Sequence, residues 1–134
     1  MKGVIKNWLI VAVVFILTGI ILGAFGAHAL KEVLSENKLN SFDTAVRYQV
    51  WMGLGLAIQA ICYQSFQVPL NRWSGRLLIA GILAFSFSIY LLVGIPDGNP
   101  IRSWVGPVTP LGGTLMIFSW ALFLYQLIRS KSVK

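Results

Sequence analysis

The sequence is short of charge, and above all of acid. Of its 134 residues, four are Asp or Glu and eleven are Lys or Arg, which makes 11% of the chain charged. A soluble domain carries about 25% charged residues, so this chain has too few to cover a surface that faces water. The scarcity argues against an ordinary soluble domain and indicates that lipid surrounds most of the chain.

Cysteine and histidine are also scarce. The single cysteine, Cys62, cannot form an internal disulfide, and His28 is the only histidine. A metal site needs three or four ligands, which this composition does not offer within the apolar segments. The sequence contains no Gly-rich phosphate loop, nucleophile elbow or pair of catalytic carboxylates. We therefore predict that the protein is not an enzyme and has no catalytic, cofactor-binding or metal-binding residues.

What the chain does have is long apolar runs, since 57% of its residues are hydrophobic. Residues 7–30 carry no charge, and about 20 helical residues cross a bilayer core. A secretory signal is the rival interpretation, with Lys2 and Lys6 before the run and Ala27-His28-Ala29 as a cleavage site. The run is longer than the roughly 7–15 residues of a signal core, so we interpret it as a transmembrane helix.

The same reasoning predicts one all-α domain over residues 1–134, a polytopic membrane protein with short loops. Its four transmembrane helices should form an antiparallel bundle and cover about residues 8–30, 44–64, 77–95 and 110–128. Residues 31–43 should form a short interfacial helix or ordered loop, with Ser41, Asp43 or Thr44 capping the next helix. Thr109 and Pro110 form a typical helix start, because proline at the first helical position loses no hydrogen bond.

The basic residues lie at the ends of the apolar segments, which argues against nucleic-acid binding and bears on orientation. One side of the predicted bundle holds no acid and seven basic residues, namely Lys2, Lys6, Arg72, Arg76, Arg129, Lys131 and Lys134. The other side holds four basic residues and all four acids. The side richer in Lys and Arg faces the cytoplasm. We therefore predict a multi-pass protein of the inner (plasma) membrane with both termini cytoplasmic.

Small residues recur at helical spacing in all four segments and predict close packing between helices. Gly19, Gly23 and Ala27 are four apart, so they should share one face. The complete set of predicted packing residues is Gly19, Gly23, Ala27, Gly53, Ala84, Gly112 and Gly113.

Polar and aromatic side chains gather at the predicted outer end and form a candidate cluster. Its members are His28, Arg47, Tyr48, Gln49, Tyr90 and Thr109. His28 either titrates or binds a ligand, or is an interfacial histidine bonded to a neighbouring helix or loop. Arg47 with Tyr48 either grips a lipid phosphate or anchors the helix while pairing with Asp43. In either case we expect His28 to hydrogen-bond across helices, to the second helix or the turn before the fourth.

Four stretches of the chain resemble motifs of one family of small four-helix membrane proteins. They are Gly23–Leu30 (GAFGAHAL), Phe42–Gln49 (FDTAVRYQ), Phe85–Tyr90 (FSFSIY) and Gly106–Gly113 (GPVTPLGG). The family is domain-of-unknown-function family four-two-three, which includes the animal proteins called transmembrane protein two-five-six. The resemblance covers about residues 8–128 and implies four helices and a bacterial inner-membrane location, with no established activity.

Three positions depart from the family pattern. Met52 stands where a histidine is common, Phe87 replaces a glycine between two serines, and Ser119 replaces a glycine before a tryptophan. Without the second histidine, a two-histidine metal or proton site is not supported.

Two functional classes remain open. The first is a non-enzymatic accessory subunit that packs against a larger membrane complex or forms a homo-oligomer. The second is a small-molecule, quinone or lipid-binding protein, or a carrier, with a polar pocket at the outer end. In both, the lipid bilayer is the surrounding partner.

Overall fold

The structure is a computed structural model that describes residues 2–65 and 73–130. All regular elements in these ranges are helical, which confirms the predicted all-α class. They are α1 (Lys2–Ala27), the short 3-10 helix η1 (Leu30–Glu32), α2 (Glu36–Ser65), α3 (Trp73–Ile82), the π-helical turn η2 (Leu83–Phe87), α4 (Ser88–Gly94), α5 (Ile101–Val105) and α6 (Val108–Arg129).

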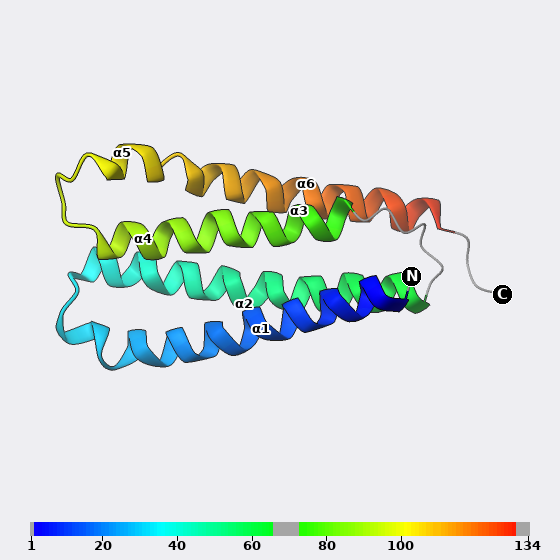
Figure 1. Cartoon of the computed structure of the whole chain (residues 1–134), viewed down its shortest axis with the longest axis horizontal. Coiled ribbons are helices and arrows are strands. Elements are labelled where there is room, and N and C mark those ends of the chain that lie inside the picture. Colours follow the sequence, from blue (N-terminus) through cyan, green and yellow to red (C-terminus); the bar gives the residue numbers. More distant parts are fainter. Residues whose placement is uncertain (1, 66–72, 131–134) are drawn as a thin grey trace.

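The elements form four long rods that lie side by side (Figure 1). α3, η2 and α4 act as one rod, because the residues that join them keep helical backbone angles. α1 packs mainly on α2, and α3 packs mainly on α6. The start of α1 and the end of α6 lie at one end of the molecule, here called the terminal end, while η1 and α5 lie at the opposite, η1–α5 end (Figure 1).

Among the residues that the structure describes, three stretches are long and apolar enough to cross a membrane: Gly3–Glu32, Trp73–Gly94 and Ile101–Arg129. α2 is not among them, because its first turns carry Glu36, Lys38 and Asp43, and glutamines follow within its length. Four membrane crossings arranged as an antiparallel bundle therefore stay a prediction.

The second helix begins much earlier than the sequence suggested. α2 starts at Glu36 rather than near residue 44, so Ser41, Asp43 and Thr44 lie inside the helix and cap nothing. The hydroxyls of Ser41 and Thr44 instead donate to the carbonyls of Asn37 and Asn40, one turn back. Such back-bonding satisfies a hydroxyl within a helix, so a residue that suits a cap does not by itself mark a helix start.

The other helix ends differ by smaller amounts. α1 already begins at Lys2 and ends at Ala27, and α6 begins at Val108 with Pro107 before it and no side-chain cap. The hydroxyl of Thr109 is engaged elsewhere, with Ser88 at 2.7 Å. A short helix, α5, occupies part of what was expected to be a loop.

Glycines let α1 approach α2 closely. A Cβ added at Gly19 would lie 2.6 Å from a methyl of Val50, and one at Gly23 would lie 3.3 Å from Val46. The next close approach is at Gly26, whose added Cβ would lie 3.0 Å from the Phe42 ring, whereas Ala27 is exposed. A helix turns by about 100° per residue, so position 26 lies nearer than position 27 to the face of Gly19. The face that contacts α2 therefore contains Gly26 in place of the predicted Ala27.

The closest helix contact joins α6 to η2. A Cβ added at Gly112 would lie 2.8 Å from the Cα of Phe85 and 2.9 Å from the carbonyl carbon of Ala84. The neighbouring Gly113 would meet only the Phe85 ring, at 3.8 Å. Gly53 on α2 is also tight, 3.3 Å from the Cβ of Phe15. Only a residue without a side chain at position 112 therefore allows the π-helical turn to pack this closely on α6, whereas position 113 has room for a methyl group.

Candidate functional site

A cleft with a volume of about 540 Å³ opens at the η1–α5 end. The start of α2, the end of α4, the turn that follows α4, and the helices α5 and α6 enclose it. Its lining residues are Ser35, Asn37, Lys38, Ser41, Thr44, Ile89, Leu92, Val93, Asp97, Arg102 and Thr109. Of the predicted outer cluster, only Thr109 lines this cleft.

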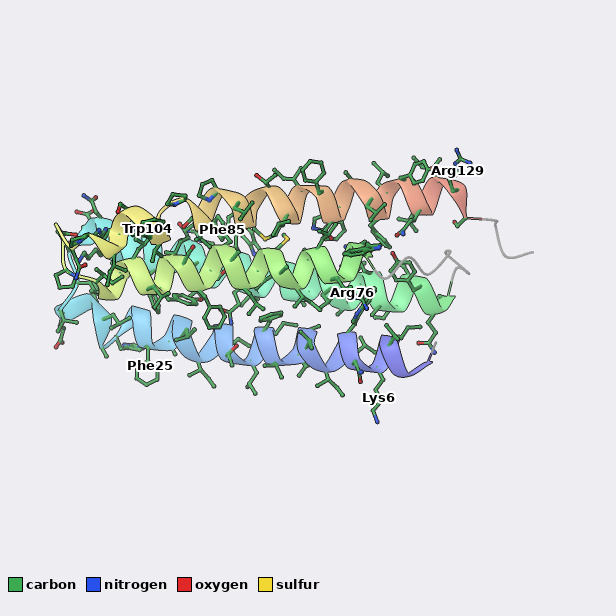
Figure 2. The ribbon with its side chains drawn as sticks, turned by 45° about the horizontal axis from the view of Figure 1, so that its top comes forward. Lys6, Phe25, Arg76, Phe85, Trp104 and Arg129 are labelled. Atoms are coloured by element: carbon green, nitrogen blue, oxygen red, sulfur yellow. The ribbon has the colours of Figure 1, made fainter. Side chains whose placement is uncertain are left out.

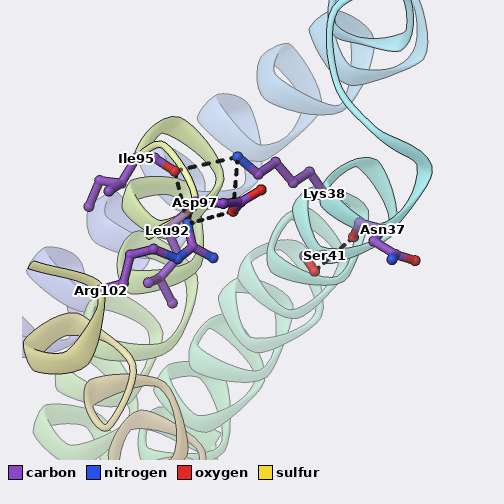
Figure 3. A network of polar contacts seen from close by, with 7 residues as sticks. All are labelled: Asn37, Lys38, Ser41, Leu92, Ile95, Asp97 and Arg102. Carbon is purple, nitrogen blue, oxygen red and sulfur yellow. Dashed lines mark hydrogen bonds and ion pairs between the residues drawn. The ribbon is translucent and has the colours of Figure 1, made fainter. Parts of the chain in front are cut away.

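One side of the cleft is charged (Figure 3). The Nζ of Lys38 and the Nη1 of Arg102 each lie 3.5 Å from the same oxygen, Oδ1 of Asp97. The Asp97 side chain is 79% exposed, whereas those of Lys38 and Arg102 are 22% and 32% exposed. Two half-buried cations therefore share one exposed carboxylate.

The turn that carries Asp97 follows from its sequence. Pro96-Asp97-Gly98-Asn99-Pro100 is rich in turn residues, and Gly98 adopts φ of +86°, a region that favours glycine. The side chain of Asn99 then accepts a hydrogen bond from the backbone N–H of Ile101 at 3.0 Å. α5 begins directly after this turn, and Arg102 in its first turn reaches back to the end of α4.

Arg102 and Lys38 also bind the end of α4. Arg102 Nη1 donates to the carbonyl oxygens of Leu92 at 2.6 Å and Ile95 at 2.9 Å, and Lys38 Nζ donates to Ile95 at 3.4 Å (Figure 3). The last carbonyls of a helix have no partner within it and carry partial negative charge. Both cations therefore have a structural role, tying the start of α2 and α5 to the end of α4.

The cleft is also lined by apolar side chains and hydroxyl groups. Ile89, Leu92 and Val93 of α4 form an apolar floor. Ser41, Thr44 and Thr109 add hydroxyl groups around that floor. A cleft lined by both cations and aliphatic side chains suits an amphiphilic molecule.

Two members of the predicted cluster lie instead in a buried network. Gln49 is 1% exposed, and its Nε2 donates to the carbonyl of Phe15 at 2.9 Å and to Thr18 Oγ1 at 2.8 Å. The hydroxyl of Tyr90 donates to Gln49 Oε1 at 2.8 Å. These bonds join α1, α2 and α4 and involve both the nitrogen and the oxygen of the Gln49 amide. Gln49 therefore stabilises the helix packing and does not contribute to the cleft.

Arg47 and Tyr48 lie on the outside of α2. Arg47 Nη2 lies 2.5 Å from Asp43 Oδ2, the pair predicted from their spacing, and both side chains are more than half exposed. Tyr48 is 37% exposed and packs its ring on Phe85 and Trp51 at centroid distances of 4.8 and 5.7 Å. Neither residue reaches the cleft.

His28 does not make the predicted contact across helices. Its side chain is exposed in the turn after α1, beside Ala24, Phe25 and Ala29, and it has no hydrogen bond within the part of the chain that the structure describes. Gly26 faces α2, and two further residues rotate the side-chain direction by about 200°. The side chain of His28 therefore points away from α2. This observation overturns the expected bond to the second helix or the turn before the fourth.

A second polar layer lies in the half of the bundle nearer the terminal end. Tyr63 donates to Gln126 Oε1 and lies 2.7 Å from Ser74 Oγ, which in turn lies 3.0 Å from Gln59 Oε1. Ser119 accepts from Gln59 Nε2 at 3.3 Å. The layer joins α2, α3 and α6, since the Ser119 hydroxyl of α6 also donates to the Ser74 carbonyl of α3 at 2.8 Å.

One sequence signal could have identified Arg102 as a residue that contacts the end of α4. A cation just after a helix end is favoured by the unpaired carbonyls there, and Arg102 follows the turn that ends α4. Lys38 could not be assigned, because its partners belong to a segment 57 residues away. Within residues 2–65 and 73–130, no group of three or more His, Cys, Asp or Glu side chains could hold a metal ion.

Comparisons with known proteins identify relatives over most of the chain. The UPF0382 membrane protein C1782.12c of Schizosaccharomyces pombe is 39% identical over 112 residues, covering 81% of this chain and 92% of the relative. The UPF0382 membrane protein YwdK of Bacillus subtilis is 31% identical over 125 residues, covering 92% and 98%. No solved structure shows significant similarity.

The family profile described as "Protein of unknown function (DUF423)" matches residues 22–113. That range contains all four motifs in full, and it includes every residue that lines the cleft. The relatives carry the name membrane protein, in agreement with the apolar helices of this chain. The chain belongs to the DUF423 family of membrane proteins, also called UPF0382.

Proposed function

We propose that all four rods cross the membrane as an antiparallel bundle, with α2 as the fourth span. Two of the three glutamines of α2 are buried, Gln49 at 1% and Gln59 at 0% exposure, and the third, Gln64, is exposed near the end of the helix. Its exposed face carries large apolar side chains, namely Trp51, Leu54, Ile58 and Ile61. A helix that buries the amides along its length and exposes large apolar side chains there suits a lipid environment, where polar groups must find partners inside the bundle.

We further propose a plasma-membrane location with both termini cytoplasmic. The sequence assigns seven basic residues and no acid to the side of the bundle that holds both chain ends. Lys6, Arg76 and Arg129 lie towards the terminal end of the molecule, and Trp104 lies at the opposite end (Figure 2). Excess Lys and Arg marks the cytoplasmic side. The cleft would then face away from the cytoplasm.

This orientation predicts the outcome of a labelling experiment. In a Cys62→Ser background, a membrane-impermeant maleimide should label Asn99→Cys in intact cells and label Lys134→Cys only after lysis. The Asn99 position lies in the turn beside the cleft, opposite the terminal end. Labelling of Lys134→Cys from outside intact cells would contradict the proposed orientation.

For the activity, we propose that the protein binds a small amphiphilic molecule or lipid in the cleft and does not transform it. The observation that carries this proposal is the cleft itself, which is lined by the cations Lys38 and Arg102 and by aliphatic side chains of α4. Ligand sites are typically concave, mostly apolar and supplied with a few convergent polar groups. The cleft volume of about 540 Å³ lies within the usual range of roughly 300–1,000 Å³.

An accessory role in a larger membrane complex is the second candidate. Part of its support was the set of small-residue faces, but Gly19, Gly53 and Gly112 contact other helices of the same chain. The remaining support is the broad exposed surface of α1, of whose apolar window only 22% is buried. Lipid would cover that face equally well, so we rank ligand binding first. Gentle solubilisation followed by mass analysis separates the two, since an accessory subunit retains stoichiometric larger proteins.

Filling the cleft tests the binding proposal. We expect Ser41→Trp to remove the lipid or small molecule that the unmodified chain retains in native mass spectrometry, because an indole at position 41 would occupy the cleft. Ser103→Trp on α5 is the matched control. Ser103, like Ser41, is an exposed serine whose hydroxyl donates to a backbone carbonyl three or four residues before it, but Ser103 does not line the cleft. Equal retention by both variants, with equal thermal stability, would contradict the proposal.

A further inference from the structure

We propose that the cleft recognises a phosphate group, held between Lys38 and Arg102, and that Asp97 competes with this phosphate for the same two cations. The inference rests on the proposed binding function of the cleft and names the chemical class of its ligand. It is carried by the charge arrangement in Figure 3 and by the amphiphilic shape of the cleft.

The charges in the cleft do not balance. Two cations face one carboxylate, and both cation–oxygen distances are 3.5 Å. This distance permits an ion pair but exceeds that of a good charge-assisted hydrogen bond, about 2.7–2.9 Å. Lys38 and Arg102 are mostly withdrawn from water, while Asp97 is largely in it. A half-buried cation is stabilised by a nearby anion, so one net positive charge remains available to a ligand.

The donors also exceed the acceptors. A guanidinium offers five N–H donors, and the hydrogen bonds of Arg102 all leave from Nη1, to Leu92 and Ile95. Among the described residues, its Nε and Nη2 have no acceptor. A guanidinium can bind a phosphate through two parallel hydrogen bonds, and a lysine adds a point charge. The hydroxyls of Ser41 and Thr44 already donate to carbonyls one turn back, and that of Thr109 is bonded to Ser88, so phosphate recognition would depend on the two cations.

The apolar floor indicates what is attached to the phosphate. Ile89, Leu92 and Val93 belong to α4, whose stretch Trp73–Gly94 is apolar enough to lie in the membrane. A phospholipid would place its phosphate beside Lys38 and Arg102 and its chains along this floor. A soluble phosphate ester would use the same cations without the floor. Both sources share the phosphate, and the experiment below separates them.

The test measures affinity of the purified full chain for three probes: phosphatidic acid, diacylglycerol with the same acyl chains, and inorganic phosphate. Phosphatidic acid should bind about tenfold or more tightly than diacylglycerol, because the two lipids differ only in the phosphate. Competition by inorganic phosphate at low concentration would assign a soluble source, and its failure to compete would assign the lipid. Equal affinity for the two lipids would overturn the phosphate inference while leaving a lipid-binding cleft. Binding of none of the three would contradict the proposed function itself.

Two variants test the competition by Asp97. Asp97→Asn should raise the affinity for phosphatidic acid about two- to fivefold, as expected for removal of a largely exposed competing charge. Lys38→Gln should lower it about tenfold, because the substitution removes one of the two cations. Asp43→Asn and Lys31→Gln make the same charge changes at this end but outside the cleft, and should leave the affinity unchanged. If Asp97→Asn weakens binding, or if the controls match the cleft variants, the proposal fails.

Discussion

Gly112→Ala is expected to lower the free energy of unfolding by about 3 kcal/mol or more, the upper range for overpacking a tight site. The added methyl carbon would overlap the backbone nitrogen of Phe85 and lie 2.8 Å from its Cα. These are backbone atoms of η2, so no side-chain rotation can relieve the overlap. The helix α6 would have to move away from α3–α4, and the π-helical turn would lose its close contact with α6.

Gly113→Ala is the matched control, one residue along the same helix. Its added carbon would have ordinary contact with the Phe85 ring at 3.8 Å. Alanine is favoured over glycine inside a helix by roughly 0.5–1 kcal/mol, so this variant should be neutral or slightly stabilised. Unfolding in mixed micelles with increasing dodecyl sulfate measures both. Similar stabilities of the two variants would contradict the close packing of α6 on η2.

Gln49→Met should lower the free energy of unfolding by about 2 kcal/mol. The substitution keeps the side-chain length but removes three hydrogen bonds, to Phe15, Thr18 and Tyr90. Interhelical hydrogen bonds in membrane proteins average about 0.6 kcal/mol each. The Tyr90 hydroxyl would also lose its acceptor in a half-buried position, which adds a desolvation cost.

Gln64→Met on the same helix is the control, because Gln64 is exposed near the end of α2. It should change the stability by less than about 0.5 kcal/mol, as is usual for surface substitutions. The same denaturation assay compares the two. A Gln49 variant as stable as the Gln64 variant would mean that the buried amide does not hold α1, α2 and α4 together.

The helical class and the membrane character of the chain could be predicted from its sequence because they depend on composition and on long apolar runs. The three stretches Gly3–Glu32, Trp73–Gly94 and Ile101–Arg129 fall where those runs occur. Close packing at Gly19, Gly23 and Gly112 could also be predicted, since small residues at helical spacing allow it. The start of α2 could not, because back-bonded hydroxyls at Ser41 and Thr44 look like caps in sequence.

The candidate site was only partly predictable. Helix direction alone indicated that polar residues meet at the η1–α5 end, and Thr109 does line the cleft there. Which of the others face inward depends on rotation of each helix about its axis. A difference of one or two residues in the α1 contact face turns His28 outward and brings Gly26 against Phe42. Lys38, Asp97 and Arg102 meet only through tertiary structure, since α2 and the α4–α5 turn are distant in sequence.

The most direct test of the binding cleft is an experimental density map of the full chain, extracted with its native lipids. The account predicts additional density between Lys38, Arg102 and Thr109, with a compact feature near the two cations and an elongated one along Ile89, Leu92 and Val93. A map at side-chain resolution in which this cleft holds only ordered water, or is closed by its own side chains, would contradict it.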